Sequence, residues 1–361
     1  MLRVCKLLLF LFIPIICIAQ NGAPASPYYN GFNFNQTGIT LRNALSALTI
    51  NKHSNFLSYT PGVWEASRIT DLDANNTNNV ILIYGWENGT DSDITNDISR
   101  SKFNNGGGTG QWNREHVFAK SLGNPALNEA GDSDAGEDAH NLRPSDVQRN
   151  SLRSNNKFAV GNGTSGFVSG GWYPGNEWKG DVARMVMYMY LRYGNQCLPK
   201  FVGTGALNSI DSNMSQIFLQ WNAEDPVSPL EDARNNFHGN TENTYAQGNR
   251  NPFIDNPFLA TQIWGGTAAQ NRWAILANTN FDGDLETLIF PNPSYNGNFT
   301  IYSSTKLSSI EIITIDGKLV QKLNYDSNNS SNYPIEIKDI GFYLLRLSTN
   351  QTSITKKVLV N

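Results

Sequence analysis

Residues 111–118 read QWNREHVF and contain a glutamate followed directly by a histidine. Its aromatic and β-branched residues on either side of a Glu-His pair predict the end of a β-strand. Neighbouring side chains on a strand point to opposite faces, so Glu115 and His116 would straddle whatever lies at that end. One could then hold a metal ion while the other handles a proton. An exposed glutamate beside a core histidine is the alternative, and the pair taken alone favours that alternative.

The residues that follow in the sequence favour a functional role for the Glu-His pair. After a loop rich in Asn, Gly and Asp come residues 138–144 (DAHNLRP), and residues 145–148 (SDVQ) then have the form of a capping box, which predicts a helix starting at Ser145. That helix would place Asn150, Arg153 and Ser154 on one face, because they are spaced i, i+3, i+4. Strand, loop, short strand and helix within about 45 residues predict a compact ββα unit.

This set of side chains suits phosphodiester hydrolysis. The reaction needs an activated water, compensation for growing negative charge and help for the leaving oxygen. Mg²⁺ binds a few oxygen ligands and keeps several waters, so Glu115 and the Asn150 amide oxygen are a sufficient pair of ligands. With a pKa near about 6.5, His116 is mostly neutral at pH 7 and can act as a base. Arg153 could hold a phosphate oxygen, a contact that contributes roughly 1.5–3 kcal/mol.

Other kinds of site fit the composition less well. The chain has four histidines and three cysteines, which argues against a closed structural zinc site. Residues 163–166 (GTSG) lack the spacing of a serine hydrolase elbow, and residues 106–110 (GGGTG) lack the lysine and helix of a nucleotide loop. We expect a buried structural role for His140. His53 and His238 are expected to be structural or on the surface.

The N-terminus indicates export. Residues 1–19 carry Arg3 and Lys6 ahead of an apolar run and end in small residues, which predicts a cleaved signal peptide; Ile16 disfavours a lipoprotein signal at Cys17. Removal of this segment leaves Cys197 as an inert thiol without a disulfide partner. No other run is long enough to span a bilayer, so no stable membrane insertion is expected.

Charge is distributed unevenly along the chain. Residues 20–286 hold 18 Lys and Arg against 26 Asp and Glu, which gives −8, whereas the whole chain is at −4. Binding of nucleic acid by bulk charge normally needs a basic face. A polyanion would therefore have to be held here by a local cluster and a metal ion.

The remaining elements give an α+β chain with two folded parts. Apolar periodicity predicts helices over residues 38–51, 181–193 and 211–222, and SPLE at 228–231 predicts a further helix start. Residues 79–84 predict a buried strand, and residues 247–255 are expected to be irregular. From residue 287 onward short strands, including 309–315 and 341–347 around a turn at 316–318, predict a small β-sandwich.

At these motifs the sequence resembles the endonuclease I family. The resemblance rests on NREHVF and DAHNLRP, on RNSLRSNNKF at 149–158, on KGDVAR at 179–184 and on QGNRNPFID at 247–255, and it covers roughly residues 28–265. It implies a secreted nuclease with a ββα-metal fold, His116 as general base, Glu115 and Asn150 as Mg²⁺ ligands, and Arg153 as a phosphate-binding residue. Products would carry 5′-phosphate and 3′-hydroxyl ends. Asn150 follows His140 at the spacing of the family pattern, so the resemblance implies Asn150 rather than Asn141 as the ligand.

This sequence departs from the family in one segment. Members with disulfides carry a cysteine-containing insertion between the two motifs, and here that stretch is short and free of cysteine. Residues supplied by the insertion therefore cannot be transferred. Arg114, Arg143 and Arg184 remain candidates for an arginine on the leaving side of the phosphate, with a structural salt bridge as the alternative for each.

The C-terminal part resembles a type IX secretion sorting domain. The resemblance rests on PNP at 291–293, the DGK turn at 316–318, GFYLLRL at 341–347 and the late pair Lys356 and Lys357. It implies an export address read by the type IX secretion machinery. An accessory β-module that binds carbohydrate or a surface is the alternative.

Together these observations predict a secreted, monomeric endonuclease without sequence specificity. It would act on DNA, with RNA as a further candidate substrate, and use Mg²⁺, with Mn²⁺ or Ca²⁺ as substitutes. We expect a signal peptide at 1–19, a mixed α/β nuclease domain with a ββα-metal motif at 20–277, a linker at 278–286 and an all-β sandwich at 287–361. The alternatives are a surface adhesin on an inactive nuclease scaffold, in which the site residues would not converge, and a small-substrate phosphodiesterase, which needs a closed pocket.

Overall fold

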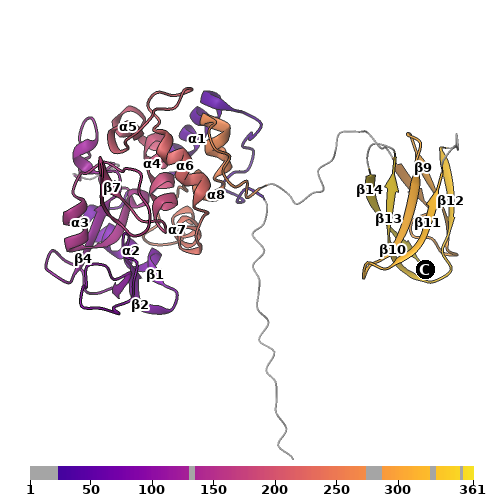
Figure 1. The fold of residues 1–361 in the computed structure, drawn as a ribbon, viewed down its shortest axis with the longest axis horizontal. Helices are drawn as coiled ribbons and strands as arrows, with labels where there is room; N and C mark the ends of the chain where they lie inside the picture. Colours follow the sequence, from indigo (N-terminus) through magenta and orange to yellow (C-terminus); the bar gives the residue numbers. More distant parts are fainter. Residues whose placement is uncertain (1–22, 130–134, 274–286, 326–330, 350–352) are drawn as a thin grey trace, which may run out of the picture. The chain divides into compact units, whose positions relative to one another are not determined.

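The computed structural model describes residues 23–129, 135–273, 287–325, 331–349 and 353–361. The chain divides into two compact units, Met1–Ile275 and Leu276–Asn361 (Figure 1). The predicted signal peptide at 1–19 and the predicted linker at 278–286 both lie outside the described residues. Helices and strands mix in the first unit and strands form the second, as the predicted fold class requires.

Nine helices named α and seven strands are assigned in the described part of the first unit. The helices are α1 Gly38–Lys52, α2 Trp64–Thr70, α3 Val147–Arg153, α4 Lys179–Tyr193, α5 Pro199–Val202, α6 Gln216–Glu224, α7 Pro229–Gly239, α8 Pro252–Asp255 and α9 Phe258–Trp264. The strands are β1 Leu72–Asp73, β2 Asn76–Ile81, β3 Ser99–Ser101, β4 Trp112–His116, β5 Leu142–Asp146, β6 Gly166–Val168 and β7 Gly171–Tyr173. They form the antiparallel sheets β1-β2-β3, β4-β5 and β6-β7.

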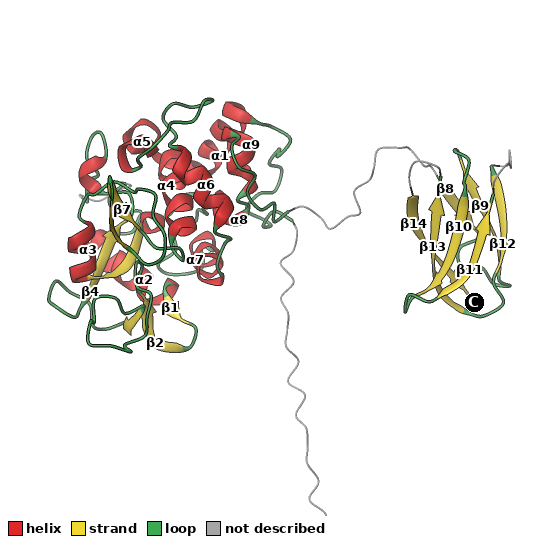
Figure 2. Cartoon of the chain, in the orientation of Figure 1, coloured by secondary structure: helices red, strands yellow, loops and turns green. Residues whose placement is uncertain are grey.

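Helix α4 is the centre of the core. Its residues from Gly180 to Leu191 are all buried, and α1, α6 and α8 pack around it. Figure 2 shows α4 and α6 side by side. The predicted helix over 181–193 is therefore confirmed, and Gly194 ends it with a positive φ of 56°, a conformation that glycine adopts without steric penalty.

Several other predicted elements are shifted. The 211–222 helix begins only at Gln216, and part of the segment at 247–255 forms the short helix α8. The 79–84 strand instead spans Asn76–Ile81. Residues 82–84 are buried as predicted but leave the strand, because Tyr84 has a φ of 74° that no strand contains. Helix α1 and the capping box of Ser228 and Glu231 on α7 are confirmed.

The quoted stretch forms β4, which pairs antiparallel with β5, and α3 follows β5 directly. Glu115 lies opposite Arg143, and His116 lies opposite Leu142. The predicted capping box at Ser145 is wrong: Ser145 stays in β5, and Asp146 is the N-cap, its carboxylate accepting the backbone N–H of Arg149 at 2.9 Å. Helix α3 ends at Arg153, so Ser154 lies just beyond it.

A buried chain of ion pairs joins β5 to the rest of the unit. Arg143 on β5 donates to Asp71 at 2.7 Å and to Asp181 on α4 at 2.9 Å. Asp71 also binds Arg234 on α7. Arg184 on α4 binds Glu231 on α7. Three arginines alternate with three acids, and all six side chains are almost fully buried. Each arginine therefore has an acidic partner in a region where an unpaired charge is very unfavourable.

The second unit is a β-sandwich, as predicted. One sheet has the order β11-β10-β13-β14 and the other has β12-β9-β8. Their inner faces share one core that includes Ile301, Ile312, Tyr333 and Leu345. The strands are β8 Thr287–Phe290, β9 Asn298–Ser303, β10 Ser309–Thr314, β11 Leu319–Asn324, β12 Asn332–Glu336, β13 Gly341–Ser348 and β14 Ser353–Val360.

Two further expectations concern single features. Cys197 is a buried free cysteine, and burial raises its thiol pKa well above the usual value, which keeps it protonated and unreactive. Among the described residues, no helix has both the length and the apolar character that crossing a membrane requires.

The ion-pair chain predicts a large effect for Arg143→Met. The substitution leaves Asp71 and Asp181 buried without this partner, so we expect the free energy of unfolding to fall by about 3–5 kcal/mol in urea titrations. Lys179→Met is the control, because the more exposed Lys179–Glu224 pair should contribute about 1 kcal/mol or less. All eight tryptophans lie in the first unit, so their fluorescence reports on that unit alone. Equal losses in the two variants would contradict the assigned role of the chain.

Candidate active site

The site is built where α3 packs on β4. Asn113 and Glu115 are two residues apart on the strand and so point to the same face, while Asn150 and Arg153 are one turn apart on the helix. The two spacings match, because Asn150 contacts Asn113 and Arg153 contacts Glu115. Helix and strand are therefore held in register at two successive points.

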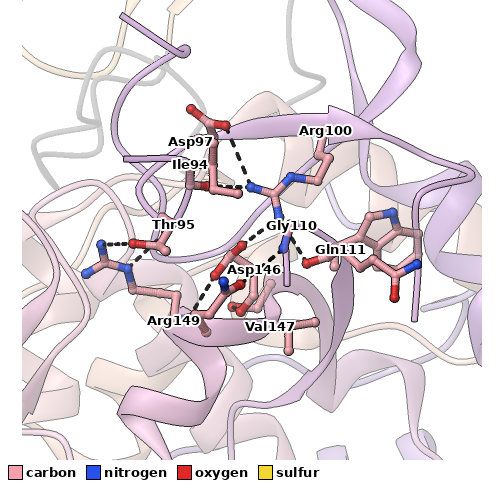
Figure 3. Close-up of polar contacts among 12 residues, drawn as sticks. Ile94, Thr95, Asp97, Arg100, Gly110, Gln111, Asp146, Val147 and Arg149 are labelled. Carbon is pink, nitrogen blue, oxygen red and sulfur yellow. Dashed lines mark hydrogen bonds and ion pairs between the residues drawn. The ribbon is translucent and has the colours of Figure 1, made fainter. Parts of the chain in front are cut away.

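The start of α3 is fixed by a second set of contacts. Arg100 on β3 donates to the Asp146 carboxylate at 2.6 Å and to the Gln111 carbonyl at 3.0 Å. Arg149 reaches the Thr95 carbonyl at 3.1 Å. Figure 3 shows the Arg100 side chain from β3 reaching Asp146, with Ile94 and Asp97 also at its guanidinium, while the Arg149 side chain points to Thr95. The N-cap of the helix that carries Asn150 is thus itself anchored to a neighbouring sheet.

Glu115 is 2% exposed, and one of its two oxygens is fully occupied. Oε1 accepts a hydrogen bond from the Tyr84 hydroxyl at 2.9 Å and pairs with Arg153 at 3.0 Å. No hydrogen bond from a described residue reaches Oε2. Burial raises the pKa of Glu115 to about 7, against the opposing effects of Arg153 and Tyr84. A cation beside Oε2 would favour the ionised form.

The His116 ring is 9% exposed and has a defined tautomer. Nε2 lies 2.8 Å from the Gly136 carbonyl, which can only accept, so Nε2 carries the proton and Nδ1 carries the lone pair. The Tyr59 ring stacks on the imidazole at a centroid distance of 5.7 Å. Burial lowers the pKa of His116 to about 4, although the Gly136 carbonyl and Glu129 act in the opposite direction. The expected pKa near 6.5 is thus corrected downward, and the ring is neutral at pH 7.

Asn150 is oriented by its nitrogen. Nδ2 donates to Asn113 Oδ1 at 2.8 Å and lies 3.5 Å from the Arg114 carbonyl. Oδ1 receives no hydrogen bond from a described residue and is available to a ligand. Asn141 differs, because the Phe118 backbone engages both its amide atoms at 2.7 and 3.2 Å. These contacts agree with the choice of Asn150 over Asn141.

Arg153 lies deeper than its predicted role suggests. Its side chain is fully buried, and besides pairing with Glu115 it donates to the carbonyls of His116 and Val117 at 2.9 and 2.8 Å. Both terminal nitrogens therefore have protein partners. These contacts fit a residue that holds Glu115 and the end of β4, while direct binding of phosphate stays a prediction.

The four predicted site residues line one cleft. It is an open depression of about 280 Å³ whose walls also include Arg114, Lys120 and Asn155. No group of three or more His, Cys, Asp or Glu side chains able to hold a metal ion occurs among the residues that the structure describes. Mg²⁺ does not require such a group, since it keeps several waters. The two available oxygens, Glu115 Oε2 and Asn150 Oδ1, are of the type that it binds.

The three candidate arginines separate clearly. Arg143 and Arg184 are buried members of the ion-pair chain, so the alternative of a structural salt bridge holds for both. Arg114 lies at the cleft, with its guanidinium between the rings of Tyr59 and Trp64 at 3.4 and 4.0 Å. It forms no ion pair with a described carboxylate.

The remaining histidines are all buried. His140 has the expected structural role: its Nε2 lies 3.2 Å from the Asn249 carbonyl, and its ring lies 5.0 Å from the ring of His238. His53 and His238 are 7% and 0% exposed, so of the two expectations the structural one holds. None of the three lines the cleft.

Sequence reasoning missed three residues that shape the site. Tyr84 reaches Glu115 from a distant loop, and Asn113 binds Asn150. Gly136 supplies the carbonyl that orients His116, and a Cβ at this position would come within 2.1 Å of the Asn128 carbonyl oxygen. Only Asn113 lay within a quoted motif; no local pattern marks the other two.

Comparison with known proteins places this geometry in context. Residues 37–258 match the family model described as Endonuclease I, and residues 288–361 match the Secretion system C-terminal sorting domain. An extracellular ribonuclease of Bacillus subtilis is 41% identical over 260 residues, which cover 67% of this chain and 82% of the relative. An extracellular ribonuclease of Bacillus amyloliquefaciens is 42% identical over 245 residues, covering 63% and 75% respectively.

The lowered pKa of His116 predicts a pH dependence of stability. Between pH 6.5 and 4 the unfolded chain binds a proton on this residue that the folded chain does not, so stability is lost as the pH falls. From pH 7 to pH 5 this residue alone should account for about 2 kcal/mol. Urea titrations of the metal-free protein should therefore show a shallower pH dependence for His116→Gln. The same slope in both proteins would refute the assigned pKa, since His53, His140 and His238 are present in each.

Proposed function

The chain belongs to the endonuclease I family, and on that premise we propose that it cleaves DNA and RNA with a histidine-activated water and one Mg²⁺. It is a secreted nuclease. The observation that carries the proposal is the convergence of Glu115, His116 and Asn150 on one open cleft. Among the described residues, no hydrogen bond reaches Glu115 Oε2, Asn150 Oδ1 or His116 Nδ1. The adhesin alternative expected these side chains not to meet.

His116 is the proposed general base. Its Nδ1 lone pair takes a proton from the attacking water, while the Gly136 carbonyl holds Nε2–H and fixes the ring. The imidazolium that forms is stabilised by this carbonyl and by the Glu129 carboxylate, which lies 3.7 Å from Nε2. Because the resting ring is neutral at pH 7, no activation by deprotonation is needed.

Glu115 Oε2 and Asn150 Oδ1 are the proposed ligands of Mg²⁺. When bound, the ion would offset negative charge on the phosphate and assist the leaving oxygen. Arg153 pairs with Glu115 Oε1 and keeps this carboxylate oriented toward the cleft. We retain a direct Arg153–phosphate contact only as a prediction, because both terminal nitrogens already have partners.

The shape of the cleft favours a polymer as substrate. An open depression admits a continuous backbone, whereas a small-substrate phosphodiesterase would need a closed pocket. A water nucleophile requires no 2′-hydroxyl, so the same chemistry applies to DNA and RNA. The relatives are named extracellular ribonucleases, which supports RNA as a substrate beside DNA. Contacts to a backbone alone would leave cleavage without sequence specificity.

The second unit is proposed to act as the export address. It matches a secretion sorting domain and lies outside the nuclease family match. We infer that the type IX secretion machinery recognises it.

The proposed base predicts a specific loss of activity. His116→Ala should lower kcat for plasmid nicking in Mg²⁺ by roughly 10²–10⁴-fold, because the water loses its proton acceptor. A chelator should abolish the wild-type activity, and Mg²⁺ should restore it. His53→Gln is the control, since His53 is buried but does not line the cleft. Wild-type rates for His116→Ala would show that the base is misassigned, and no nicking in Mg²⁺, Mn²⁺ or Ca²⁺ would refute the enzyme itself.

The chemistry of the ends tests the nucleophile. Attack by water in the proposed direction leaves 5′-phosphate and 3′-hydroxyl ends, so DNA ligase should reseal singly nicked plasmid without prior end repair. RNA fragments should likewise carry 3′-hydroxyls that a poly(A) polymerase can extend. Fragments ending in 2′,3′-cyclic phosphate would instead indicate attack by the 2′-hydroxyl and would rule out a water nucleophile on RNA.

A further inference from the structure

We propose that Tyr84 and Asn113 are positioning residues of the cation site, each holding the one atom of a ligand side chain that the ion does not use. The inference rests on the proposed function, because it takes Glu115 and Asn150 as the ligands. It goes further by explaining how two side chains from different elements come to present one oxygen each.

Asn113 determines which end of the Asn150 amide faces the cleft. An amide can rotate to exchange its oxygen and nitrogen, and only its hydrogen-bond partners decide between the two orientations. Asn113 Oδ1 lies 2.8 Å from Asn150 Nδ2, and the Arg114 carbonyl, which cannot donate, lies 3.5 Å from the same nitrogen. Both contacts favour nitrogen on the β4 side. Oδ1 of Asn150 is thereby left for a cation.

Tyr84 performs the equivalent task on Glu115. Its hydroxyl donates to Oε1 at 2.9 Å, on the oxygen that also pairs with Arg153. Two donors on one oxygen leave the other as the free end of the carboxylate.

The backbone at Tyr84 points to a role beyond packing. Its φ of 74° is a left-handed conformation that is unfavourable for a bulky residue and persists only where surrounding contacts impose it. The Tyr84 carbonyl is held there by the Ser165 hydroxyl at 2.7 Å. An apolar core residue gains nothing from this conformation, whereas a hydroxyl that must reach a buried carboxylate does.

Cation binding in the absence of substrate is the test. Titration of Mn²⁺ into the full chain, followed by electron paramagnetic resonance of the free ion, gives the Kd without any activity measurement. Asn113→Leu and Tyr84→Phe should each raise this Kd roughly 10–100-fold, the usual effect of removing a partner that orients a ligand. Nicking activity lost by either variant should return at high Mg²⁺.

Matched variants separate positioning from structure. Asn113→Asp keeps an acceptor for Asn150 Nδ2 and should retain the wild-type Kd or better. Tyr188→Phe removes a buried hydroxyl that donates to Asp138 at 2.7 Å and does not line the cleft, so this variant should leave the Kd unchanged. His116→Ala should also bind Mn²⁺ normally while losing activity.

The outcomes distinguish this inference from the function on which it rests. A wild-type protein that binds Mn²⁺ and cleaves DNA, with unchanged Kd in Asn113→Leu and Tyr84→Phe, would overturn the inference alone. A wild-type protein that binds no Mn²⁺ and cleaves nothing would overturn both. If Asn113→Leu fails to fold by tryptophan fluorescence, Asn113→Ser and Tyr84→Phe decide the matter: wild-type Kd values in both would refute the positioning role.

Discussion

The alternating chain of buried arginines and acids is the interaction on which the rest of the first unit depends. Arg143 is its central residue, and Arg143 lies directly opposite Glu115 in the β4–β5 pair. Its two carboxylate partners come from the β1 side and from α4, so one guanidinium ties the strand pair of the site to both. Such an arrangement is specific because removing any member takes a partner away from at least one buried group of opposite charge. The core helix and the site are thus fixed to one another.

Around this anchor, the cleft combines buried groups with incomplete hydrogen bonding. Glu115, His116 and Asn150 each have one atom held by the protein and one without a described partner. Burial keeps the His116 ring neutral and raises the pKa of Glu115, so the imidazole is prepared to accept a proton and the carboxylate is stabilised by an arriving cation. An acidic domain can therefore still act on a polyanion, through a local site rather than through its overall charge.

Local patterns predicted the long elements well and the short ones less well. The apolar stripe of α4 and the capping box of α7 are strong signals within one segment, and both were confirmed. Ser145 had a plausible capping pattern, yet Asp146 caps α3, and Arg100 from another strand binds the Asp146 carboxylate and holds it at the N-cap. The strand predicted through Tyr84 ends early, because the backbone at Tyr84 is left-handed, and the Tyr84 hydroxyl contacts Glu115.

Local sequence was enough to indicate the available chemistry: a Glu-His pair at a strand end, a helix one short strand later that carries Asn150 and Arg153, and a separate β-rich tail. These features follow from residue types and spacings along one segment. Only the tertiary structure decided which atom of each side chain is free, that Arg153 is buried against Glu115, and that Tyr84 and Gly136 complete the site. Those outcomes depend on contacts between residues that lie 20 to 38 positions apart, and a hydrogen bond across such a separation leaves no periodic trace in the sequence.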